Sequence, residues 1–200
     1  MTINPQQHKL YYRISKIIST FFYSGLLKPA SGTFGTFFGI LFFIVFNCNS
    51  ITALQEILCC FVLLILGVIS IKYYTTNLNN KDPKEVVIDE VLGIFISIFI
   101  SKFILHKINA SLIFTKPIII LGLSEIDKYF LDVNKHYIFI SLFYLLNFIF
   151  FRIFDIFKPF PCNYFDKIKN SFGVMIDDLI AGIYSGIISA SVILTLYFYN

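Results

Sequence analysis

The chain has 200 residues, 57% of them hydrophobic and 14% charged, and its net charge is +4. A mean hydropathy of +0.78, with 25 Phe and 12 Tyr residues, exceeds what the core of a soluble domain of this length can hide, so the composition excludes a soluble globular enzyme and predicts one integral membrane domain. The basic residues are spread over the loops between apolar runs. That distribution favours anionic lipid headgroups or phosphate as partners over nucleic acid, and no protein partner is inferred.

The N-terminal segment, residues 1–28, alternates apolar and basic side chains at helical spacing. Leu10 and Ile14 alternate with Lys9 and Arg13. This pattern predicts an amphipathic helix, which either lies on an anionic membrane surface or packs on the membrane domain. The segment has no apolar core followed by a small-residue cleavage site, so no cleaved signal peptide is expected.

Small and hydroxyl-bearing residues introduce the first apolar run. Residues 29–36 read PASGTFGT, and the apolar residues continue to Phe46. Gly32 and Gly35 permit close approach of another backbone, and the free N–H groups at a helix start attract an anion. Counted over residues 31–48, this run is short for a membrane span, so it is expected to tilt, to thin the bilayer or to insert only in part.

Residues 57–71 predict a second span that carries no chemistry of its own. Tyr73 and Tyr74 follow it as interfacial aromatic residues, and the polar residues 75–85 form a loop. The chain's four cysteines lack the spacing of a metal or redox site, and two of them lie inside this span, so we interpret them as small hydrophobic residues.

Two adjacent carboxylates stand at the start of the third apolar helix, which begins VVIDEVLG at residue 86. Adjacent positions on a helix point about 100° apart, so Asp89 and Glu90 can serve two neighbouring ligands or divide two roles. Acids flanked by Val, Ile and Leu are costly, which favours a functional role over a simple response to the helix dipole. Gly93 permits a second helix to approach this face, and Ser97 and Ser101 continue the stripe of small residues.

The second half of the chain predicts two further spans. Residues 102–136 are mixed in character and predict a peripheral or re-entrant insertion, with a sixth span as the alternative. Residues 137–151 and 174–199 predict the fourth and fifth spans, and the fifth carries a G-x-x-x-G pair at Gly182 and Gly186. The predicted fold is therefore an all-α integral membrane bundle of about five membrane-embedded helices, formed by residues 29–200.

A charged stretch, residues 151–178, separates these last two spans and reads FRIFDIFKPFPCNYFDKIKNSFGVMIDD. Arg152, Asp155 and Lys158 share one broad helical face, on which the cations can grip phosphate while the acid turns toward a metal or orients a base. The prolines after Lys158 end the helix. Lys167 and Lys169 are explained by the positive-inside rule without catalysis.

A topology of five spans brings these charges together. With a cytoplasmic N-terminus, which the distribution of Lys and Arg supports, the small residues 31–36 and all of the acidic motifs fall at one cytoplasmic membrane boundary. Clustered carboxylates repel one another unless a hard cation such as Mg²⁺ joins them, and Mg²⁺ in proteins is held by carboxylates together with phosphate oxygens. The residues therefore predict a membrane site for phosphate-ester hydrolysis.

An ion-coupled transporter or channel is the alternative, because intramembrane acids also mark ion paths. That alternative predicts acids distributed through the depth of the bilayer and a broken helix at its midplane, whereas these acids gather at one face. A CDP-alcohol phosphotransferase also uses membrane aspartates, but its D-x-x-D-G-x-x-A-R signature is absent from the sequence.

Four segments together resemble the phosphatidylglycerophosphatase A family. They are PASGTFGT, VIDEVLG, FRIFDIFKPFP and GVMIDDLIAG, in the family's order between about residues 29 and 190. The resemblance implies a Mg²⁺-dependent, multi-pass enzyme of the bacterial inner membrane that converts phosphatidylglycerophosphate to phosphatidylglycerol and phosphate. The residues at motif positions are Gly32, Thr33, Gly35, Asp89, Glu90, Arg152, Asp155, Lys158, Asp166, Gly173, Met175, Asp177 and Asp178.

From these positions we predict the roles of the site residues. The predicted catalytic and metal-binding residues are Asp89, Glu90, Asp155, Asp177 and Asp178. The predicted substrate-binding residues are Gly32, Thr33, Arg152 and Lys158. The chain departs from the family's pattern at residues 170–172, which read NSF where the family usually has a glycine pair, so no backbone contact with phosphate is assigned there. Residues 102–136 are also longer than usual for the family, and no role is carried onto them.

Overall fold

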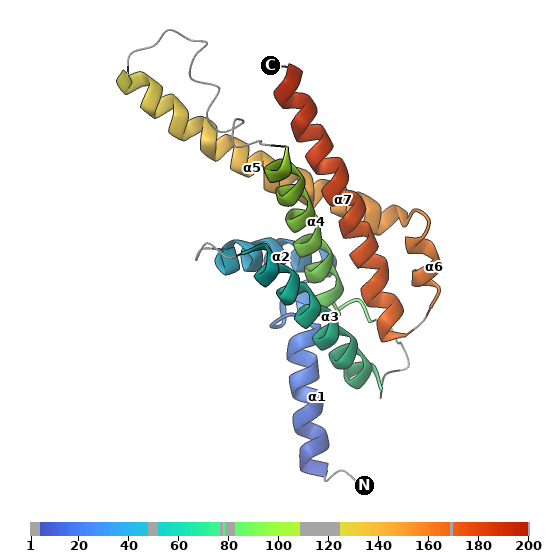
Figure 1. Ribbon diagram of the computed structural model, residues 1–200. Helices are drawn as coiled ribbons and strands as arrows, with labels where there is room; N and C mark the ends of the chain where they lie inside the picture. Colours follow the sequence, from blue (N-terminus) through green and yellow to red (C-terminus); the bar gives the residue numbers. More distant parts are fainter. Residues whose placement is uncertain are drawn as a thin grey trace.

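The computed structural model describes residues 5–47, 52–76, 78, 83–108, 125–168 and 170–199, and within these ranges all regular secondary structure is helical, with no strand. Figure 1 shows the arrangement of the helices. They are α1 (Pro5–Ser19), the 3₁₀ helix η1 (Ser24–Leu26), α2 (Ser31–Asn47), α3 (Ala53–Thr75), α4 (Ile88–Lys107), α5 (Glu125–Phe157), α6 (Cys162–Asp166) and α7 (Ser171–Tyr199). The predicted all-α class is confirmed.

Three helical segments are long and apolar enough to cross a membrane: Ala53–Thr75, Phe139–Phe157 and Ser171–Leu196. The predicted number of about five is not confirmed. The helix α2 has 17 residues, a length of about 25 Å, which is less than the hydrocarbon thickness of a typical bilayer. The helix α4 has 20 residues, but its longest uncharged segment comprises only the residues between Glu90 and Lys102.

The region predicted as an insertion, residues 102–136, is divided differently in the structure. The helix α4 continues to Lys107, and α5 already begins at Glu125, upstream of the predicted start of the fourth span at residue 137. Residues 125–136 contain neither proline nor glycine, so nothing in the sequence interrupts the helix there. The apolar run 111–123, which carried the prediction of a re-entrant segment, lies outside the described residues.

The helix α4 is the centre of the bundle and packs against α2, α3, α5 and α7. Its residues Val91, Leu92, Ile94, Phe95 and Ile98 are fully buried. Burial on several sides explains why its apolar residues are nearly continuous rather than confined to one stripe.

The helices α4 and α7 run side by side and in the same direction (Figure 1). A side chain at Gly182 would overlap the carbonyl of Gly93, and a Cβ at Gly186 would lie 2.6 Å from the carbonyl oxygen of Ser97. The predicted packing role of the G-x-x-x-G pair is therefore confirmed, because only glycine admits this backbone approach.

The remaining contacts fix the direction of the other helices. Gly32 lies beside Glu90, Gly67 of α3 lies beside Met175, and Phe151 of α5 lies beside Gly93. From these contacts, the first residues of α2, α4 and α7 and the last residues of α3 and α5 lie at one end of the bundle. This end is called the polar end below.

The N-terminal helix α1 packs on α3 and extends away from the bundle (Figure 1). Tyr11 stacks on Tyr73 with ring centroids 6.4 Å apart, and Tyr12 lies 5.5 Å from Tyr74. Leu10, on the predicted apolar face, is exposed. Packing on the membrane domain, one of the two predicted arrangements, is thus observed, whereas the amphipathic role is not confirmed.

The predicted break after α5 is confirmed. The helix ends at Phe157, and Lys158 adopts a left-handed conformation with φ of 43° before Pro159. A residue that precedes proline disfavours the helical region, and proline itself cannot donate a hydrogen bond. The chain then turns into α6, which packs against α7.

Candidate active site

Three carboxylates converge at the polar end. Asp89 and Glu90 lie in the first turn of α4, Asp178 lies near the start of α7, and one oxygen from each is within 4.8 Å of the others. The close approach of α4 and α7 at Gly93 brings them together, since a Cβ at Gly93 would lie 2.8 Å from the carbonyl oxygen of Asp178. Asp89 and Asp178 are buried, with exposures of 8% and 4%.

Both acidic pairs have the same local geometry. The backbone N–H of Glu90 donates to Asp89 Oδ1 at 3.0 Å, and the N–H of Asp178 donates to Asp177 Oδ1 at 3.1 Å. In each pair the first carboxylate is oriented by the backbone of the second, which leaves its other oxygen for another partner.

Arg152 of α5 lies beside these carboxylates. Its Nη1 is 2.7 Å from Asp155 Oδ2 and 3.9 Å from Glu90 Oε1, and it donates to Thr36 Oγ1 of α2 at 3.4 Å. A Cβ at Gly32 would overlap Glu90 Oε1 and lie 3.0 Å from Arg152 Nη1. Glycine at this position therefore lets the first turn of α2 lie directly against the polar groups.

Lys158 joins α5 to α6 and α7. Its Nζ lies 2.6 Å from Asp177 Oδ2 and also pairs with Asp166. Burial lowers the pKa of Lys158, but the hydrogen bonds to the two aspartates outweigh burial and raise its pKa above the ordinary value. The lysine is therefore a permanent cation at neutral pH.

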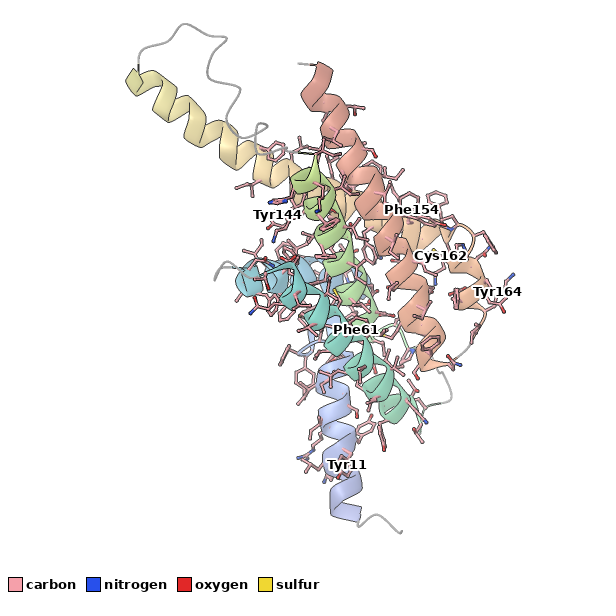
Figure 2. All side chains as sticks on the ribbon, in the orientation of Figure 1. Tyr11, Phe61, Tyr144, Phe154, Cys162 and Tyr164 are labelled. Carbon is pink, nitrogen blue, oxygen red and sulfur yellow. The ribbon has the colours of Figure 1, made fainter. Side chains whose placement is uncertain are left out.

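The cysteine nearest to this pair is not a nucleophile. Cys162 is fully buried beside α7, and burial raises the pKa of its thiol. Figure 2 shows Cys162 and Tyr164 on α6, with Phe154 of α5 on the same side of α7. The ring of Phe154 lies 5.8 Å from that of Tyr184, so an aromatic contact joins α5 to α7 on this side.

The structure brings together most, though not all, of the residues predicted from the sequence. Asp89, Glu90 and Asp178 form the carboxylate group, whereas Asp155 and Asp177 lie at its margin, paired with Arg152 and Lys158. The predicted substrate residue Thr33 is exposed on α2. The motif residues Gly173 and Met175 pack against Ile168 and Gly67, which indicates a structural role for both.

Sequence reasoning missed two residues at this end. Thr36 is fully buried, donates to the carbonyl of Gly32 at 2.8 Å and accepts from Arg152. Its position one turn after Gly32 is the signal that points to it. Asn170, at the departure from the family's pattern, accepts from the N–H of Gly173 at 2.7 Å and so caps the start of α7.

The polar end has the chemistry of a cation site. Glu90 Oε2 is buried and has no hydrogen-bond partner among the described residues. Buried polar groups are normally paired, and an unpaired carboxylate oxygen beside two other carboxylates suits a hard divalent cation. Arg152 and Lys158 stand next to the carboxylates and can bind the oxygens of an anion.

Comparisons with known proteins agree with this chemistry. The family model described as phosphatidylglycerophosphatase A matches residues 17–193. A Haemophilus influenzae protein named phosphatidylglycerophosphatase A is 28% identical over 177 residues, which cover 86% of this chain and 84% of the relative. A Bacteroides thetaiotaomicron protein provisionally named a phosphatidylinositol-3-phosphatase is 29% identical over 110 residues, 55% of this chain and 48% of the relative.

No solved structure matches the chain. The family match covers all four motifs and the whole polar end. It confirms the predicted lipid phosphatase and leaves the alternative of an ion-coupled transporter without support. The chain therefore belongs to the phosphatidylglycerophosphatase A family.

Proposed function

We propose that the chain removes the terminal phosphate of phosphatidylglycerophosphate at the polar end of its bundle, on the cytoplasmic face of a bacterial inner membrane. Water attacks the phosphorus atom, the ester bond to the glycerol oxygen breaks, and that oxygen takes up a proton. The products are phosphatidylglycerol and inorganic phosphate. The observation that carries this proposal is the convergence of Asp89, Glu90 and Asp178 beside Arg152.

Asp89, Glu90 and Asp178 are the residues proposed to hold Mg²⁺. Their oxygens lie close enough to share one ion, and the unpaired Glu90 Oε2 supports this assignment. When bound, Mg²⁺ neutralises charge on the phosphoryl group and activates water for attack.

The two cations are proposed to bind the phosphate group. Arg152 is paired with Asp155, and Lys158 with Asp177. When a phosphate monoester arrives, its oxygens replace these carboxylates as partners of the cations. Asp155 and Asp177 are then released within reach of the reacting groups, where either can accept the proton of the attacking water.

The position in the membrane is supported by the apolar helices and by the distribution of basic residues. The short helix α2 and the central helix α4 complete a membrane-embedded set of five with the three candidate spans. The basic residues of α1 are proposed to contact anionic lipid headgroups while its tyrosines pack on α3. This arrangement keeps the polar end at the level of the headgroups, where the phosphate to be hydrolysed lies.

The direct test is phosphate release from phosphatidylglycerophosphate in detergent with Mg²⁺, comparing the natural chain with Asp178→Asn. The variant keeps the shape of the side chain and loses its charge, so we expect turnover to fall by about 100-fold or more. Unchanged turnover would remove Asp178 from the site. Ion flux in liposomes without any phosphatase activity would overturn the proposed function as a whole.

A further inference from the structure

A second polar group lies deeper in the bundle, among the same three helices that carry the active site. It consists of Ser97 and Ser101 of α4, Asn147 of α5 and Ser185 of α7, all of which are fully buried. The hydroxyls of Ser97 and Ser101 donate to Asn147 Oδ1 at 2.7 and 3.1 Å. Sequence reasoning treated the serines only as small packing residues and did not identify Asn147.

Asn147 is the member that joins all three helices. Its side-chain carbonyl accepts from α4, and its backbone carbonyl accepts from Ser185 Oγ of α7 at 3.1 Å. Ser185 Oγ also lies 2.8 Å from Ser97 Oγ, so the contacts between α4 and α7 close the group. The side-chain nitrogen of Asn147 donates to the carbonyl of Phe143 in its own helix at 2.9 Å, which fixes the orientation of the amide.

In each of the three helices, a member of this group lies seven or eight residues from a carboxylate of the proposed site. Ser97 follows Asp89 by eight residues, Ser185 follows Asp178 by seven, and Asn147 precedes Asp155 by eight. Seven or eight residues make about two helical turns, or about 11 Å along the axis, and return to the same face. Each helix therefore carries a carboxylate and, two turns deeper on the same side, one member of the hydrogen-bonded group.

Apolar contacts are non-directional, so they specify the register of a helix such as α5 less sharply than hydrogen bonds do. Hydrogen bonds between buried polar side chains are directional, and a shift by one residue would separate the side-chain oxygen of Asn147 and three hydroxyls from these partners in an apolar interior. A single buried asparagine fixes register between helices in coiled coils by the same physics.

We propose that Asn147 is a positioning residue for the phosphatase reaction. It holds α5 in the register in which Arg152 and Asp155 face Asp89, Glu90 and Asp178. This inference rests on the proposed site at the polar end, yet it concerns a residue that touches neither substrate nor metal. Because catalysis depends on geometry at the level of about 1 Å, a loss of register is expected to reduce turnover even though every active-site residue is retained.

The test compares Asn147→Leu with a control variant, Ser191→Ala. Leucine fills a similar volume and removes the hydrogen bonds, whereas Ser191 is an exposed residue of α7 whose hydroxyl donates only to Ile187 within the same helix. We expect kcat of Asn147→Leu to fall by about 10- to 100-fold and the Mg²⁺ concentration at half-maximal activity to rise. The control should retain the values of the natural chain.

A measurement independent of activity reads the register itself. Spin labels at exposed positions on α4 and α5, introduced as Phe103→Cys and Leu145→Cys in a chain without its native cysteines, report the distance between the helices. We expect one narrow distance distribution with Asn147 present and a shifted or broadened distribution with Asn147→Leu. The double variant Ser97→Ala and Ser101→Ala removes the donors from the opposite side and should reproduce both effects, without adding to those of Asn147→Leu.

Several results would overturn the inference. If kcat and the Mg²⁺ requirement of Asn147→Leu equal those of the natural chain, Asn147 does not position the site. If kcat falls while the distance distribution is unchanged, the register mechanism is wrong. Should Asn147→Leu fail to fold, the double serine variant is judged by the same two criteria. Failure of the proposed function is recognised separately, because the natural chain and the Ser191→Ala control would then both be inactive.

Discussion

The two ends of the helical bundle both bury carboxylates but balance them differently. At the end opposite the polar end, Glu56 stands in the first turn of α3 with 2% exposure, and Lys102 Nζ of α4 lies 2.5 Å from its Oε1. The same lysine donates to Asn47 Oδ1 at the end of α2 at 3.0 Å. One buried acid thus has one cation, and the pair ties together the ends of three helices.

At the polar end the acids outnumber the cations. Arg152 and Lys158 are already paired with Asp155 and Asp177, and Arg152 lies farther, at 3.9 Å, from Glu90 of the group of Asp89, Glu90 and Asp178. A buried acid that is paired with one cation needs no further partner, which indicates a structural role for Glu56 and Lys102. An excess of buried negative charge is costly unless a further cation joins it, which supports the proposal that binding and chemistry occur at the polar end.

The largest expected effect is that of removing divalent cations, which tests the excess of buried acids at the polar end directly. Removal of divalent cations with a chelator should abolish phosphate release, and added Mg²⁺ should restore it. The same treatment should lower the melting temperature of the natural chain more than that of Asp178→Asn, because the ion stabilises only a site that can bind it. Equal activity with and without chelator would contradict the assignment of Mg²⁺ to the polar end.

The comparison is sharpened by neutralising one buried glutamate at each end. Glu90→Gln should reduce turnover by about 100-fold or more, because it removes a charge from the carboxylate group. Glu56→Gln makes the same chemical change at the balanced end and should leave kcat and KM nearly unchanged in protein that folds. Phosphate release from the two purified variants, normalised to folded protein, shows whether turnover depends on the glutamate at the polar end and not on the one at the balanced end.

Replacement of the arginine at the polar end should have a smaller effect. Arg152→Lys keeps the charge but places all its N–H donors on one nitrogen, which cannot span Asp155, Thr36 and a phosphate oxygen as the planar guanidinium can, so kcat/KM should fall by about 10-fold or more. Lys167→Ala is the control, since Lys167 is an exposed basic residue directly after α6. A fall of similar size in the control would indicate general attraction of the anionic lipid rather than a specific contact.

The smallest effect on activity is expected at the balanced end. Lys102→Met leaves Glu56 buried without a cation, which should lower the free energy of unfolding by about 1–3 kcal/mol while turnover at low temperature is retained. Replacing both partners, as Glu56→Leu with Lys102→Met, should recover much of the stability. Thermal unfolding in detergent measures both variants, and a loss of turnover without a loss of stability would show that this end also serves the reaction.

Much of this organisation could be predicted from residue order. The apolar runs predicted the all-α class, the prolines after Lys158 predicted the end of α5, and the pair of Gly182 and Gly186 predicted the close packing of α7. These features depend on local chemistry, on hydrophobic length and on residues that lack a side chain or an N–H group. They can therefore be predicted from the order of the residues alone.

The beginning of α5 was predicted too far along the chain, and the predicted number of about five spans is not confirmed. Hydropathy does not show that a central helix such as α4 can be buried by protein rather than by lipid, so its charged ends were counted inside a span. Nor does a change from apolar to polar residues end a helix, which is why α5 begins upstream of its apolar part.

The sequence by itself determined which residue types the site contains, because acids and cations at the ends of apolar runs are too costly to occur without a use. Only the tertiary structure decided which of them lie together: Asp89, Glu90 and Asp178 in one group, with Asp155 and Asp177 paired to the cations. The same holds for Thr36, Asn147 and the pair of Glu56 with Lys102, which lack a motif of their own. Their partners on other helices are 38 or more residues away in the chain, and only the packing of the helices brings them within hydrogen-bonding distance.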